Sequence, residues 1–201
     1  MRLRTRLLKS KLSQENAISE IEHFDKKAAV EMRRISKKSL EGIASSLKDV
    51  EAKMLEVVHM DREVRVLYEL VTSVKCVGKV LATDLIIYTH GFTRMLDGKK
   101  LACYCGVAPF EYQSGTSIYG TPGTSNFANK VLKYDLHMAA MSAIRHCPEL
   151  KEYYQRKREE GKGKMTILNA IRNKLLHRIV AVVKRGTPYQ DRIALKKVEM
   201  D

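Results

Sequence analysis

The chain has 201 residues, of which 44% are hydrophobic and 30% are charged, so one or two small domains with a buried core are expected. Its formal net charge of +14 favours a polyanionic partner, most simply nucleic acid, although basic helix pairs also occur on membrane surfaces and in ribosome-associated proteins. No secretory signal or apolar run of membrane length is seen, which argues against a membrane protein. We therefore expect a cytoplasmic, nucleoid-associated protein.

The positive charge is concentrated towards the C-terminus. Residues 126–201 carry seventeen Lys and Arg against eight Asp and Glu, whereas residues 1–73 carry fifteen against twelve. The polyanion is therefore expected along the C-terminal helices. Four scattered cysteines and six scattered histidines have neither the number nor the spacing of a disulfide framework or a zinc site, so no metal ligand and no cofactor is predicted for this chain.

Residues 1–12 form a short basic start, and residues 13–70 follow a helical pattern. Two apolar series repeat at steps of three and four, with a one-residue slip at 36–39, close to Gly42, that predicts a bend or a change of phase. Such a narrow stripe with charged flanks is typical of a coiled coil or helical hairpin used for association. The alternative is that these helices pack on their own domain, since this would give the same apolar pattern. The apolar positions are Ile18, Ile21, Ala28, Met32, Ile35, Leu40, Ile43, Leu47, Val50, Met54 and Val57.

Residues 71–98 begin with a turn, Ser73–Ala82, that has the shape of a helix-hairpin-helix bend. In such a bend glycines expose backbone N–H groups to a phosphate, which makes Gly78 and Lys79 candidate DNA contacts. Cys76 stands where the first glycine of the bend would be, and its side chain hinders a close backbone approach. A purely structural hairpin is therefore the alternative.

Residues 101–125 contain a short apolar run, Leu101–Val107, that is consistent with a strand or an extended buried segment. A loop rich in Gly, Pro, Ser and Thr follows, for which an irregular hairpin is one arrangement, and it contains the pair Ser114-Gly115. A loop between rigid elements can present a reactive hydroxyl that a helix face would bury. The alternative is that these residues only form turns.

Residues 126–186 are predicted to form basic helices, followed by a tail at 191–201. Thr124 or Ser125 is expected to cap the first helix, and the helix N-terminus with Asn126 and Lys130 would bind a phosphate near Ser114. The alternative is that the hydroxyls of Thr124 and Ser125 only cap the helix and bind no phosphate.

The last of these helices is expected to bury Leu168, Ile171, Leu175, Ile179 and Val182. Its other side carries Arg172, Lys174 and Arg178, which we expect to follow a nucleic-acid backbone.

The ordered set of features over roughly residues 60–190 resembles the C-terminal half of IS110/IS1111-family transposases. It consists of the turn at Ser73–Ala82, Gly106-Val107-Ala108-Pro109, Ser114-Gly115, Thr124-Ser125-Asn126 and the end of the last helix, Lys184–Tyr189. The resemblance implies that Ser114 is a nucleophile for DNA strand cleavage and transfer. It also implies dimers or tetramers formed through residues 13–70 and an element-encoded guide RNA as partner.

In that family an N-terminal RuvC-like domain supplies four carboxylates that bind divalent metal, with Mg²⁺ expected, and no counterpart of it is recognised here. We therefore expect a mainly α chain that binds DNA but holds half of an active site and is inactive alone. The predicted order is a coiled coil or helical hairpin, then a compact helical domain with a strand or hairpin insertion. The alternatives are a non-catalytic dimeric nucleic-acid-binding module and a helical interaction scaffold.

Overall fold

The computed structural model describes residues 2–114, 118–125 and 127–190; for Arg2 and residues 111–114 and 118–122 it describes the backbone alone. The described residues form eight helices and two paired strands, which confirms the expected mainly α fold. The chain divides into two compact units, residues 1–62 and residues 63–201. The predicted tail at 191–201 lies outside the described residues.

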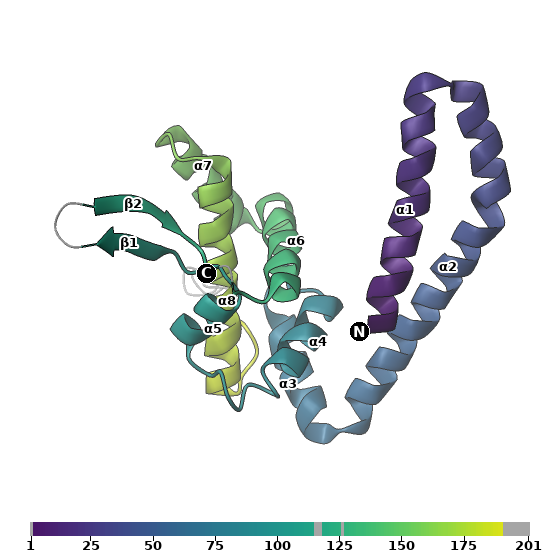
Figure 1. Cartoon of the computed structure of the whole chain (residues 1–201). Coiled ribbons are helices and arrows are strands. Elements are labelled where there is room, and N and C mark those ends of the chain that lie inside the picture. The colour runs from purple at the N-terminus through teal and green to yellow at the C-terminus, as the bar shows by residue number, and fades with distance from the viewer. Residues whose placement is uncertain (1, 115–117, 126, 191–201) are drawn as a thin grey trace, which may run out of the picture. The chain divides into compact units, whose positions relative to one another are not determined.

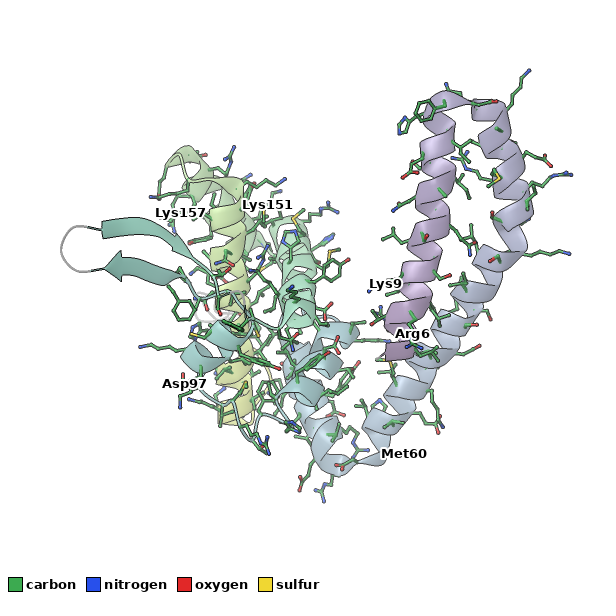
Figure 2. The ribbon with its side chains drawn as sticks, viewed as in Figure 1. Arg6, Lys9, Met60, Asp97, Lys151 and Lys157 are labelled. Atoms are coloured by element: carbon green, nitrogen blue, oxygen red, sulfur yellow. The ribbon has the colours of Figure 1, made fainter. Side chains whose placement is uncertain are left out.

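The first unit is a helical hairpin of α1 (Arg2–Phe24) and α2 (Lys26–Met60), seen in Figure 1. Two side-chain pairs establish that the helices run antiparallel: Arg4 Nε lies 2.8 Å from Glu51 Oε1, and Gln14 donates to Ser39 Oγ over 3.0 Å. Few apolar side chains are buried between them, among them Ile18 and Leu47. Several others stay more than half exposed: Leu3, Leu12, Val30, Ile35, Val57 and Met60, of which Met60 is labelled in Figure 2.

The break between these helices lies at Asp25, and no bend between two helices occurs at 36–39; the other predicted alternative, one long helix with a change of phase, agrees with the continuous α2. Asp25 is the N-cap of α2, because its Oδ1 accepts hydrogen bonds from the backbone N–H groups of Lys27 (2.8 Å) and Ala28 (3.1 Å). No comparable group interrupts α2 at 36–39, and the helix continues through Gly42. The basic start at 1–12 is helical, since α1 already begins at Arg2.

The second unit is built around α8 (Lys164–Arg185), whose buried face includes the predicted residues Leu168, Ile171, Leu175, Ile179 and Val182. Three helices pack directly on it: α5 (Gly98–Tyr104), α6 (Lys130–His146) and α7 (Pro148–Glu159). The remaining helices, α3 (Arg62–Ser73) and α4 (Lys79–Tyr88), precede them, and α4 packs on α6 (Figure 1).

The apolar run at 101–107 forms most of α5 and its C-terminal cap, so the predicted strand is wrong there. Asp97, labelled in Figure 2, starts this helix by accepting a hydrogen bond from the backbone N–H of Lys99 over 2.8 Å. A short apolar run has no period that separates a strand from a buried helical turn. The strands come later, as β1 (Phe110–Ser114) and β2 (Ile118–Gly123).

Candidate serine hairpin and nucleic-acid interface

Ser114 is the last residue of β1, and its Cα partner across the antiparallel pair is Ile118, the first residue of β2. At the opposite end of the hairpin Phe110 pairs with Gly123. Figure 1 shows β1 and β2 extending away from the helices, and Ser114 is the residue at which β1 ends. Gly115 lies outside the described residues. The backbone therefore carries Ser114 to the tip of a protruding hairpin.

Hydrogen bonds from α6 and α8 hold both ends of the hairpin. Asn169 Nδ2 of α8 donates to the carbonyl oxygen of Val107 over 2.8 Å, just before β1. Lys133 Nζ of α6 donates to Thr124 Oγ1, just after β2, also over 2.8 Å. The backbone N–H of Asn129 donates to the carbonyl oxygen of Tyr104 over 2.8 Å and so joins the start of α6 to the end of α5.

Gly106 allows α5 to turn into the segment before β1. Its φ is +64°, a left-handed conformation that favours glycine, and a Cβ at this position would lie 2.4 Å from Ala128 Cβ. The close approach of residues 106 and 128 brings the two ends of the hairpin segment together.

The N-cap of α6 is Asn129, whereas the sequence predicted Thr124 or Ser125. Asn129 Oδ1 accepts hydrogen bonds from the backbone N–H groups of Val131 (3.0 Å) and Leu132 (3.1 Å). Ser125 Oγ instead accepts from the backbone N–H of Phe127 over 3.2 Å, outside the helix. Asn126 lies outside the described residues.

We expected Arg172 on the outer face of α8, but the structure buries it: only 5% of its surface is exposed. Its Nη2 lies 2.5 Å from His137 Nδ1, and its Nη1 lies 3.5 Å from Asn169 Oδ1. No carboxylate of the described residues pairs with it, and its buried Nε has no partner among them. The cation is thus desolvated without a counter-charge from this part of the chain.

The pKa of His137 lies below the ordinary histidine value, because burial disfavours the charged ring and because Arg172 and Lys164 add positive charge nearby. Burial lowers the pKa of Arg172 as well, but a guanidinium stays protonated near neutral pH. Since Arg172 donates to Nδ1, neutral His137 carries its proton on Nε2. His137 was not among the predicted residues, although its helical spacing from Lys130 and Lys133 was a signal for it.

The other two predicted cations of α8 have partners within the second unit. Lys174 is exposed, with Nζ 4.6 Å from the centre of the Tyr153 ring. Arg178 is paired with Glu149 over 2.5 Å and lies 5.5 Å from the centre of the Tyr189 ring. Together with the buried Arg172, they do not form the single row that the sequence suggested.

The turn between α3 and α4 places Gly78 at the N-cap of α4, with φ −86° and no side-chain cap, and Lys79 as the first exposed residue of the helix. Cys76 adopts φ +68°, so it takes the left-handed conformation of the glycine that it replaces. The turn and α6 enclose a pocket of about 240 Å³. It is lined by Cys76, Gly78, Val80, Leu81, Asp135, Met138, Ala139 and Ser142.

The outward side of α6 carries a row of exposed side chains, which we call the α6 outer face. It consists of Phe127, Lys130, Val131, Tyr134 and Met138. Phe127 lies just before the helix and is fully exposed, and Tyr134 is 63% exposed. The core side of the same helix is formed by Leu132, Leu136, Ala139, Ala140 and Ala143. The predicted phosphate contact Lys130 thus lies beside aromatic rings.

Neither a metal site nor a membrane span is found among residues 2–114, 118–125 and 127–190. They contain no group of three or more His, Cys, Asp or Glu placed to hold a metal ion. None of their helices is long and apolar enough to cross a bilayer.

Comparisons of the sequence with known proteins find similarity to transposases and to a gene-inverting protein. Residues 68–155 match the sequence model of the IS116/IS110/IS902 transposases. The chain is 26% identical to the pilin gene-inverting protein of Moraxella lacunata over 75% of its own length and 47% of that protein. It is 29% identical to an uncharacterised 43.6 kDa protein of insertion element IS110 from Streptomyces coelicolor, over 65% of its own length and 32% of that protein.

The chain therefore spans at most about half the length of these relatives. The matched region begins within α3 and ends within α7, so it contains the α3–α4 turn, the serine hairpin and α6. On these matches the chain resembles the IS116/IS110/IS902 transposases over residues 68–155.

Proposed function

We propose that this chain is the nucleophile-bearing part of a DNA recombinase, in which Ser114 attacks a DNA phosphodiester. The position of Ser114 at the end of β1 is the observation that carries the proposal, because the backbone delivers this residue to the tip of a hairpin away from the helical core. A hydroxyl at such a tip reaches a phosphate of a duplex without the helices having to enter the groove. The match of residues 68–155 to the sequence model of the IS116/IS110/IS902 transposases supports a role in DNA recombination.

In the proposed step the Ser114 hydroxyl loses its proton to a base and its Oγ forms a bond to phosphorus. The bond from phosphorus to the 3′ oxygen breaks, and an acid protonates this oxygen to give a free 3′ hydroxyl. The fragment downstream of the break is then held by its 5′ phosphate as a phosphoserine ester. Attack by a 3′ hydroxyl of another strand on this ester reverses the step and joins the strands.

The described residues supply cations for this reaction but no metal-binding carboxylate cluster. Residues 63–190 carry 20 Lys and Arg against 10 Asp and Glu, and we assign DNA binding to this unit. Lys130, Lys79 and Lys174 are exposed candidates for phosphate contact. Any Mg²⁺ chemistry is assigned to a RuvC-like domain outside these residues, and guide RNA is proposed as a second partner.

The helical hairpin of α1 and α2 is proposed as the association surface. Its two helices leave large apolar side chains exposed, and a second copy of the hairpin would cover them. A dimer or tetramer would bring two or more serine hairpins to one recombination site.

Covalent capture tests the nucleophile directly. The chain is incubated with a nicked DNA substrate that traps a cleaved intermediate, with and without a separately supplied RuvC-like domain, and the products are run on a denaturing gel. We expect a protein–DNA adduct that needs both proteins. Ser114→Ala should abolish the adduct, whereas Ser125→Ala is the matched control, because the Ser125 hydroxyl lies beyond the other end of the hairpin.

An adduct that persists in Ser114→Ala would reject the proposed nucleophile. If no adduct forms while salt-dependent DNA binding is unchanged by Ser114→Ala, the chain is a non-catalytic nucleic-acid-binding module. Absence of nucleic-acid binding even at low salt would instead favour a helical scaffold.

A further inference from the structure

The α6 outer face exposes several large apolar side chains to water. Three of them follow one another at helical steps on α6, with Val131 42%, Tyr134 63% and Met138 51% exposed, and Phe127, just before the helix, is 100% exposed. Exposed apolar residues are usually scattered, and a contiguous row of them marks a binding surface. The core of the second unit does not need these side chains, since the opposite side of α6 already packs on α8 and α4.

Charge indicates what kind of ligand this face binds. Lys130 lies within the row and is exposed, and Lys133, on the next face, is half-buried against Thr124. The one acidic residue of α6 is Asp135, which lines the pocket beside α4. The second unit has twice as many basic as acidic residues, and its α6 outer face combines aromatic rings with a lysine. Such a surface suits a ligand that combines flat rings with negative charge.

We propose that the α6 outer face binds unpaired nucleotides, whose bases stack on Tyr134 and Phe127 while Lys130 contacts the phosphate backbone. A base paired within a duplex has both faces covered by its neighbours, so only a single-stranded or flipped-out base can stack on these rings. The proposal rests on the nucleic-acid function proposed above, and it adds a preference for unpaired over duplex segments.

The pocket beside α4 continues this face. Met138 belongs to both, and Ser142 and Asp135 place a hydroxyl and a carboxylate in the pocket wall.

The test is a binding measurement on the full chain by fluorescence anisotropy, with a labelled oligo-dT that cannot pair and a labelled DNA duplex with the same number of phosphates. Tyr134→Leu keeps an apolar side chain of similar reach but removes the ring, and Tyr134→Phe keeps the ring. We expect Tyr134→Leu to weaken oligo-dT binding about tenfold, with the duplex affinity changed less than twofold and the Tyr134→Phe affinity unchanged.

Two further variants complete the design. Lys130→Ala should reduce the slope of log affinity against log salt by about one for oligo-dT, whereas Tyr134→Leu should leave that slope unchanged. Met165→Ala is the matched control, because Met165 is a similarly exposed apolar residue, 58% exposed, at the start of α8. Tyr134 and Met165 are both largely exposed, and equal melting temperatures of the variants will confirm that they fold.

The outcomes separate this inference from the proposed function. If both DNAs bind and Tyr134→Leu leaves oligo-dT binding unchanged, the inference is overturned while nucleic-acid binding stands. If neither DNA binds at low salt, the proposed function itself fails. If Tyr134→Leu binds oligo-dT as the wild type does but shifts the oligomeric state on sedimentation, the face is a contact between copies of the chain and the inference is again overturned.

Discussion

Arg172 donates from Nη2 to His137 Nδ1 over 2.5 Å, and this bond joins the buried face of α8 to α6 below the anchored ends of the serine hairpin. The guanidinium approaches a neutral ring because no carboxylate of the described residues lies within reach. A buried cation without a counter-charge is costly, and its cost falls when an anion comes near. A DNA phosphate near the hairpin base would be such an anion.

The stability of the second unit should decrease when the pH is lowered through the histidine range. The pKa of His137 is lower in the folded chain than in the unfolded chain, through burial first and then through Arg172 and Lys164. The unfolded chain therefore takes up the proton first, so the stabilisation is complete above the unfolded pKa of about 6.5 and is lost as the pH falls below it. Thermal unfolding between pH 7.5 and 5.5 should show a larger fall in Tm for the wild type than for His137→Gln.

Arg172→Met provides the control for this pH effect. It removes one of the two positive charges that depress the pKa of His137, so the histidine Hε1 resonance should titrate at a higher pH than in the wild type. A His137 resonance that titrates above the ordinary histidine range in the wild type would contradict the sign of this prediction.

The break between α1 and α2 should depend on the carboxylate of Asp25. Asp25→Ala removes the acceptor for the N–H groups of Lys27 and Ala28, and loss of an N-cap costs about 1 kcal/mol of unfolding free energy. Urea unfolding of the helical hairpin measures this change. Asp49→Ala, an exposed acidic position within α2, is the matched control and should change stability by less than about 0.5 kcal/mol. Equal effects of the two substitutions would rule out a capping role.

The helical parts of the fold were predictable where an apolar period is long. The spacing of Leu168, Ile171 and Leu175 gave the buried face of α8 correctly, because a helix of this length must bury one continuous stripe. Short runs failed, as at 101–107, because a single helical turn and a buried strand have the same composition.

The candidate site was less predictable, since side-chain burial depends on packing between elements that are distant in sequence. Arg172 is basic and lies among exposed polar residues of α8 in the sequence, yet it faces His137 from a helix about 35 residues earlier. The α6 outer face illustrates the converse, because its apolar spacing is that of a buried stripe while the residues are exposed. The nucleophile role of Ser114 remains a prediction until the adduct is measured.

Gly106 should not tolerate a side chain. Gly106→Ala places a methyl group 2.4 Å from Ala128 Cβ and forces a φ of +64° on a non-glycine residue, so we expect a loss of about 2–4 kcal/mol in unfolding free energy. Gly123→Ala, at the last residue of β2, is the matched control, because a Cβ there meets no atom within 4 Å. Urea unfolding measures both, and an unaffected Gly106→Ala chain would contradict the close approach at residue 128.

Cys76→Gly should stabilise the turn before α4. Cys76 holds φ +68°, which costs a non-glycine residue about 1–2 kcal/mol, and glycine adopts this conformation without that cost. The greater freedom of glycine in the unfolded chain and the lost contacts of a half-buried thiol offset part of the gain, so we expect a net increase of about 0.5–1 kcal/mol in unfolding free energy. Cys103→Gly is the matched control: it puts the same substitution within α5, where glycine costs about 1 kcal/mol, and should destabilise the chain. A loss of stability in both variants would mean that the Cys76 side chain contributes more through packing than its backbone conformation costs.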